Sequence, residues 1–169
     1  GGPDMFIAPN DNLGPQARAG TIKDISDLAA GKLGDYSELS IGGMSYEGKL
    51  YGIPESLKAV ALWYNKDMLT TPPATTAEHK TQKEGGTPNA ISYGCYHHWG
   101  FFGSFGADVF DSNFNFATDA GNQAEMTAAI SYLNDLYAIS VANNWPKNDS
   151  DGLAPFSEGR VAAITNGNW

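Results

Sequence analysis

The chain has 169 residues, of which 41% are hydrophobic, and its 10 basic and 19 acidic side chains give a formal net charge of −9. This length suits one ordinary domain or two small lobes. The acidic balance argues against binding to nucleic acid or to anionic lipid, which need basic surfaces, and leaves an uncharged ligand compatible. The single cysteine, Cys95, permits no internal disulfide, and we expect it to be a small buried residue rather than a reactive thiol.

The first fifty residues predict short elements joined by polar turns. Residues 5–8 (MFIA) predict a short buried strand. The polar residues 10–12 then suit the start of a helix over residues 13–19, which Gly20 would end. Further expected elements are helical segments at 25–30 and 36–44 and a Glu47-Gly48 turn between two short strands.

The stretch from residue 49 to residue 69, KLYGIPESLKAVALWYNKDML, divides into three parts. Its start is strand-like, and Pro54 then begins a break, because proline lacks a backbone donor and fixes its own φ. Residues 59–64 form a nearly unbroken apolar run, which predicts a strand buried on both faces. We therefore expect a first partial lobe at 1–54, a hinge crossing at 55–59, and most of a second lobe at 60–169.

The remaining residues alternate between helical and strand patterns. We expect a polar helix at 77–84, a strand at 89–92, a helix within the aromatic segment 93–110, a short helix at 154–158 and a buried strand at 161–165 followed by an Asn166-Gly167 turn. The longest helix should be capped by Thr118 or Asp119, with an apolar stripe of Ala124, Ala128, Ile130, Leu133, Leu136 and Tyr137. This alternation predicts an α/β architecture with largely parallel strands.

Two motifs in this chain resemble one known family. The GIP and YNKDML elements, at their separation, resemble the hinge of the extracellular solute-binding proteins of ABC importers, and most closely the maltose- and maltodextrin-binding branch. The final NGNW is similar to the NGPW of that family, whose tryptophan is a stacking platform. The resemblance implies an α/β, periplasmic-binding-protein-like two-lobe fold of type II, incomplete here at both ends.

The resemblance also implies what such a protein does. It implies a non-enzymatic receptor, extracellular or periplasmic and in some cases lipid-anchored, which binds a neutral oligosaccharide between its lobes and delivers it to membrane-embedded permease subunits. Hinge closure is the expected mechanism, since only the closed state contacts the sugar from both sides. We expect no cofactor and no nucleic-acid partner, and exposed strand edges would let the fragment self-associate.

Three groups of residues are candidate ligand-binding residues. Asn10, Asp11 and Asn12 offer donors and acceptors suited to sugar hydroxyls, although a helix cap alone also explains them. The resemblance matches Asp11 to an acidic sugar-binding residue. Tyr96, Trp99 and Trp169 offer flat rings for stacking on pyranose faces, with core packing as the alternative, and the resemblance matches them to aromatic positions of the family's cleft.

The third group, Glu55 and Lys58, lies in the predicted crossing. A polar pair there would bond a ligand at the bottom of a cleft, while a hinge salt bridge or a solvated loop explains it equally well. The family often has an acidic ligand residue in this break, and counting back from Tyr64 places it at Lys58.

Two other functions remain open from the sequence. A glycoside hydrolase would need two carboxylates facing each other across an aromatic cleft, and Asp11, Glu55 and Asp108 are available. A rigid carbohydrate-binding or adhesion module would bind sugar without lobe motion. The adjacent His97 and His98 diverge by about 100° on a helix, so we do not expect them to bind one metal ion.

Overall fold

The structure is a computed structural model that describes residues 2–111, 116–117 and 122–169. It divides into two compact units, Gly1–Lys58 and Ala59–Trp169, which are described separately. The boundary between them lies inside the predicted crossing at residues 55–59, whose role as a hinge stays a prediction. Across the described ranges, no helix is both long enough and apolar enough to cross a membrane.

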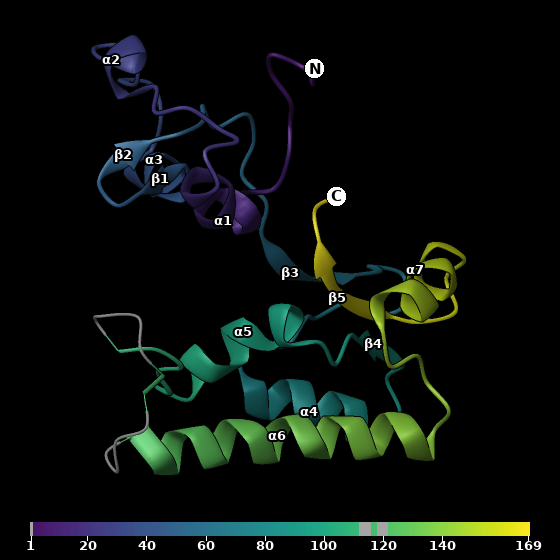
Figure 1. The fold of residues 1–169 in the computed structure, drawn as a ribbon. Helices are drawn as coiled ribbons and strands as arrows, with labels where there is room; N and C mark the ends of the chain where they lie inside the picture. The colour runs from purple at the N-terminus through teal and green to yellow at the C-terminus, as the bar shows by residue number, and fades with distance from the viewer. Residues whose placement is uncertain (1, 112–115, 118–121) are drawn as a thin grey trace. The chain divides into compact units, whose positions relative to one another are not determined.

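The first unit is built from short helices and one hairpin (Figure 1). Its elements are η1 (Asn10–Asn12), α1 (Leu13–Arg18), α2 (Ser26–Ala29), α3 (Glu38–Gly43), β1 (Ser45–Tyr46) and β2 (Lys49–Leu50). Glu47 and Gly48 turn between the strands with φ of 49° and 74°, the left-handed pair that a tight two-residue hairpin requires. Ser37 begins α3, because its side chain accepts a hydrogen bond from the Ser40 amide. The helices, the hairpin and their turns are therefore where the sequence predicts them.

The predicted strand at residues 5–8 is wrong. These residues are not in a strand, and Met5 and Ile7 are 87% and 84% exposed. A strand is stable only when its backbone pairs with a neighbour, and no strand of the described residues pairs with this segment. Apolar composition alone was therefore not sufficient to make it a strand.

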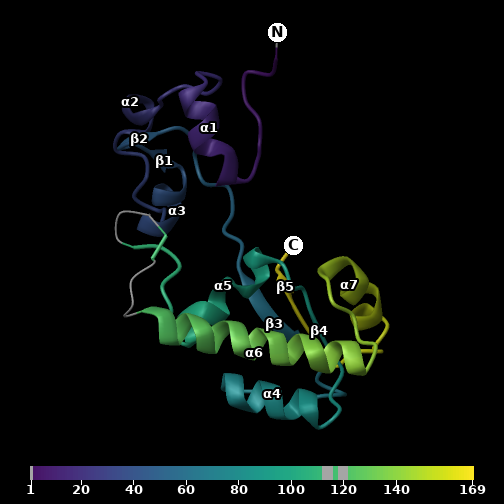
Figure 2. The same cartoon turned by 60° about the horizontal axis from the view of Figure 1, so that its bottom comes forward.

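The second unit has a three-stranded sheet and four helices among its described residues (Figures 1 and 2). Its elements are β3 (Val60–Tyr64), α4 (Thr76–Glu84), β4 (Asn89–Ile91), α5 (Cys95–Ser104), α6 (Gln123–Ala142), α7 (Asp149–Ser157) and β5 (Ala163–Gly167). The strand order is β3-β5-β4, with β5 antiparallel to β3 and parallel to β4. The α/β class is confirmed, but the expectation of largely parallel strands is wrong for this sheet.

The antiparallel pairing corrects two further predictions. The strand β3 is an edge strand rather than a strand buried on both faces, and its side chains alternate between half-buried and exposed, with Trp63 42% exposed. The Asn166-Gly167 pair is not a turn, because both residues continue β5 and Gly167 lies opposite Val60 in the ladder. Pairing with β3 therefore carries β5 two residues beyond its predicted end.

The sheet has a separate apolar cluster on each face. Ala90 packs with Val161, Ile164 and, from α7, Phe156, whereas Ile91 packs with α6 residues and with aromatic rings of α5. Neighbouring strand residues point to opposite faces, so α7 covers one face and α5 with α6 covers the other. Because Gly167 lies four residues after Ala163, these two residues share the face opposite Ile164.

The buried stripe of α6 differs from the predicted one. The buried residues are Ala129, Tyr132, Leu133, Leu136 and Ser140, while Ile130 and Tyr137 are 47% and 45% exposed. The helix is turned so that Tyr132 meets α4, where its hydroxyl lies 2.7 Å from the Nδ1 atom of His79. The predicted caps, Thr118 and Asp119, lie outside the described residues.

A buried polar network joins α4, β4 and α6. The His79 ring lies between the Tyr132 hydroxyl and the Asn89 side-chain amide, each at 2.7 Å. Lys83 is 1% exposed and donates from Nζ to the Asn89 carbonyl oxygen at 2.7 Å. Burial lowers the pKa of Lys83 to about 7, and burial together with the Lys83 charge lowers the pKa of His79 to about 4. The network therefore favours neutral forms of both groups.

Candidate aromatic binding site

The first turn of α5 presents Tyr96 to solvent. Gly94 precedes the helix in an extended conformation, and its carbonyl accepts a hydrogen bond from the His97 amide at 3.1 Å. Tyr96 and Trp99 are three residues apart and therefore lie on one side of the helix. Their side chains are 61% and 47% exposed, so neither is a core residue.

The end of β5 brings Trp169 next to this turn. The Tyr96 and Trp169 ring centroids lie 6.0 Å apart with an interplanar angle of 49°. Trp169 is 59% exposed, so this aromatic pair of Tyr96 and Trp169 leaves most of both rings open to solvent. Two side chains separated by 73 positions in the sequence thus form one surface suited to stacking.

Among the ring contacts of the described residues, none joins Trp99 to Trp169. The Trp99 ring lies 5.6 Å from that of Phe110, whose ring lies 5.1 Å from that of Phe116. Phe116 is 72% exposed. The structure therefore places Trp99 in a second aromatic group beside the pair, and the phenylalanines were not predicted as surface residues.

The adjacent histidines lie in different surroundings. His97 contacts the aromatic pair edge-on, with its centroid 5.6 Å from that of Tyr96 and 6.2 Å from that of Trp169. His98 is buried against Tyr93, whose ring centroid is 5.1 Å away, and burial is the main cause of its lowered pKa. The two rings therefore contact different neighbours, and the expectation that they do not bind one metal ion stays a prediction. The contact of His97 with the pair was not predicted, although its place next to Tyr96 was a signal.

Cys95, the first residue of α5, is exposed. The prediction that it is buried is therefore wrong. It begins the helix at the solvent-facing turn that also carries Tyr96, so the apolar sequence around it did not indicate a core position.

The polar candidates of the first unit are exposed. Asn10 donates from Nδ2 to the Gly43 carbonyl oxygen at 3.0 Å, which ties η1 to the end of α3. Asn12 precedes α1 but makes no side-chain cap hydrogen bond, so the helix-cap interpretation is wrong. Asp11 is exposed at the centre of η1. Its role as a sugar ligand stays a prediction.

Glu55 and Lys58 are also exposed. Among the ion pairs of the described residues, none joins these two side chains, so the salt-bridge interpretation has no support. Pro54, immediately before them, is buried and anchors the start of the segment. Ligand binding by this pair stays a prediction.

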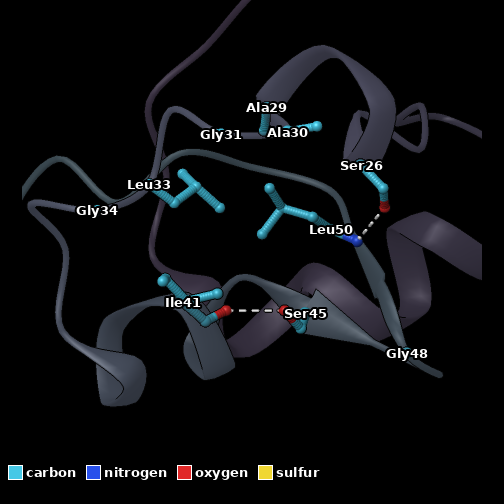
Figure 3. A pocket seen from close by; sticks show the side chains of 10 residues that line it. All are labelled: Ser26, Ala29, Ala30, Gly31, Leu33, Gly34, Ile41, Ser45, Gly48 and Leu50. Atoms are coloured by element: carbon cyan, nitrogen blue, oxygen red, sulfur yellow. Dashed lines mark hydrogen bonds between the residues drawn. The ribbon is translucent and has the colours of Figure 1, made fainter.

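The first unit also contains an open, mostly apolar pocket of about 430 Å³ (Figure 3). Leu33, Ile41 and Leu50 line it, and the Ser26 hydroxyl at its rim accepts a hydrogen bond from the Leu50 amide at 3.0 Å. None of the predicted ligand-binding residues lines this pocket. The aromatic pair on the second unit therefore remains the better candidate for a sugar site.

Comparison with known proteins identifies the family. The family described as bacterial extracellular solute-binding protein matches residues 1–169, and the chain belongs to it. A maltooligosaccharide ABC transporter solute-binding lipoprotein of Streptococcus pneumoniae is 29% identical, over 99% of this chain and 43% of its own length. A maltodextrin-binding protein of Bacillus subtilis is 27% identical with the same coverage. The chain thus spans less than half the length of these relatives.

Solved structures agree with this assignment. The maltotriose-binding protein of Thermus thermophilus, bound with maltotriose, matches 96% of this chain and 46% of its own, with a TM-score of 0.74 and 26% identity. The GacH receptor of Streptomyces glaucescens matches 99% of this chain and 46% of its own, with a TM-score of 0.77 and 24% identity, which supports the fold alone. The predicted family and fold class are confirmed, and the family is one of extracellular binding proteins rather than enzymes.

Proposed function

We propose that this chain contributes to a receptor that binds a neutral oligosaccharide of the maltodextrin type. The observation that carries the proposal is the aromatic pair, whose rings lie 6.0 Å apart and are 61% and 59% exposed. Burying an aromatic ring is favourable, so two large rings left open at one place suit an apolar ligand face. A pyranose offers such a face, with hydroxyl groups at its edge that bond to polar side chains.

The charge and the relatives support an uncharged ligand and a role in import. A net charge of −9 disfavours anionic ligands, while sugars carry no charge to be repelled. The relatives named above are solute-binding proteins for maltooligosaccharide or maltodextrin, and one is named as part of an ABC transporter. We propose that the whole protein acts outside the cytoplasm and delivers its sugar to permease subunits, with residues 55–59 as the hinge and with Asp11, Glu55 and Lys58 among the ligand contacts.

Calorimetric titration with maltotriose tests this proposal. Trp169→Ala should weaken binding about tenfold or more, which corresponds to a loss of about 1.4 kcal/mol, the scale of a lost aromatic contact. Leu153→Ala is the matched control, because Leu153 is 55% exposed on α7, which covers the other face of the sheet. Equal affinities for Trp169→Ala and the unmodified chain would contradict the assignment of the site.

A further inference from the structure

The Trp169 ring lies against Gly167, the last residue of β5. Trp169 follows this glycine by two positions. A Cβ atom added at Gly167 would overlap three carbons of the Trp169 six-membered ring, and these are the three nearest atoms that it would meet. The φ angle of Gly167 is outside the left-handed region. The position therefore excludes a side chain because of the indole, and the backbone itself would accept alanine.

His97 borders the same indole. Its ring meets Trp169 at an interplanar angle of 64° and meets Tyr96 at 82°, both of which are edge-on arrangements that aromatic rings favour. The Nε2 atom of His97 is buried and has no hydrogen-bond partner among the described residues. Leaving a buried polar atom unpaired is costly. Because Nε2 makes no hydrogen bond, the ring contacts with Tyr96 and Trp169 are what hold the His97 side chain in this position.

The strand beneath the indole is itself fixed. The Trp63 indole nitrogen donates to the Asn166 carbonyl oxygen at 3.0 Å, which ties β3 to the residue before Gly167. The Asn166 side-chain oxygen accepts a hydrogen bond from the Gly167 amide at 2.8 Å. These two hydrogen bonds hold the strand end at Gly167, and the Trp169 ring packs against this backbone.

We propose that Gly167 and His97 are positioning residues that hold the Trp169 indole in its place before any ligand binds. Gly167 does so by leaving room for the ring, and His97 does so by bounding the edge of the aromatic pair. A surface that is already ordered loses less conformational freedom on binding, so its affinity is higher. The value of this positioning for sugar binding rests on the proposed function, whereas the positioning itself does not.

Fluorine NMR of the full chain labelled with 5-fluorotryptophan tests the positioning without sugar. The chain has four tryptophans, and Trp63→Phe, Trp145→Phe and Trp169→Phe assign three of the four resonances. Gly167→Ala and His97→Ala should each move the Trp169 resonance by more than its linewidth and leave that of Trp145 in place. His97→Phe should restore the original position, because it keeps a flat ring. Gly100→Ala is the matched control, since a Cβ there meets nothing within 4 Å.

A Trp169 resonance that stays in place in both Gly167→Ala and His97→Ala would overturn the proposal. A second test repeats Gly167→Ala in the Trp169→Ala background, where the Trp63 and Trp145 resonances should not move. If these two resonances do move, the glycine at position 167 is required by the strand itself and not by the Trp169 indole, and the proposal is overturned as well. Maltotriose is added last, and its failure to bind to the unmodified chain would count against the proposed function alone.

Discussion

The Lys83 amine donates to the Asn89 carbonyl oxygen at 2.7 Å in the interior of the second unit, with the Trp145 ring centroid 5.3 Å from its Nζ atom. No carboxylate is paired with Lys83 among the ion pairs of the described residues. A lysine that loses water without gaining an opposite charge favours its neutral form. This arrangement makes the stability of the fold depend on pH.

The first prediction concerns that dependence. The pKa of Lys83 falls from 10.5 to about 7 on folding, so between these values the unfolded chain binds more protons than the folded chain. The free energy of unfolding should therefore decrease as the pH is lowered from 9 to 7, by up to about 1.4 kcal/mol per pH unit, and this contribution should level off below 7. Urea unfolding at several pH values measures it.

Lys83→Met removes the titrating group and should flatten the pH dependence between 7 and 9. Lys66→Met is the control, because Lys66 is exposed and its removal should leave the slope as it was. A slope that is identical in Lys83→Met and the unmodified chain would show that Lys83 does not cause the dependence.

The second prediction concerns the contact between α7 and the sheet. A Cβ at Gly152 would lie 2.8 Å from the Cβ of Ala90 and 3.1 Å from the Cδ1 of Ile164. Both neighbours are buried strand residues, and the nearer atom, the Ala90 Cβ, cannot rotate away, so Gly152→Ala should destabilise the fold by about 1–3 kcal/mol. Gly100→Ala, in the open part of α5, should instead stabilise it by about 0.5–1 kcal/mol. Thermal or urea unfolding of both variants is the measurement, and equal effects of the same sign would refute this account of packing.

The third prediction concerns the edge strand. Trp63→Phe keeps a ring but removes the donor to the Asn166 carbonyl oxygen, and it should cost about 0.5–1.5 kcal/mol. The loss should be local, with faster amide exchange at Asn166 and Gly167 than in the unmodified chain. Exchange at Ile91, on the other edge strand of the sheet, should be unaffected. Unchanged exchange at Asn166 and Gly167 would mean that the bond does not hold the strand end.

The sequence predicts the local elements better than their pairing. The hairpin at Glu47-Gly48 and the helix ended by Gly20 depend on turn chemistry within a few residues, and both are observed. The burial of β3 depends on its sheet neighbours, which periodicity does not reveal, so its apolar run indicates a sheet interior although the strand forms an edge. The exposed segment at residues 5–8 was mistaken for a strand for the same reason.

For the candidate binding site too, the sequence predicts the chemistry of single residues better than the contacts between them. Residue chemistry identified Tyr96, Trp99 and Trp169, and the structure brings Tyr96 and Trp169 together. Gly167 was missed because its part depends on where the Trp169 ring lies, not on the chemistry of glycine. The available signal was that Gly167 precedes Trp169 by only two residues, but the predicted turn at Asn166-Gly167 gave the glycine another explanation.

If the proposed function is right, a maltodextrin stacks on the aromatic pair of Tyr96 and Trp169. Titrating maltotriose into the chain labelled with 5-fluorotryptophan tests this most directly, because each tryptophan reports on its own surroundings. We expect the Trp169 resonance to move in a saturable manner while that of Trp145, beside the buried Lys83, stays in place. Saturable binding that leaves the Trp169 resonance unmoved would contradict it.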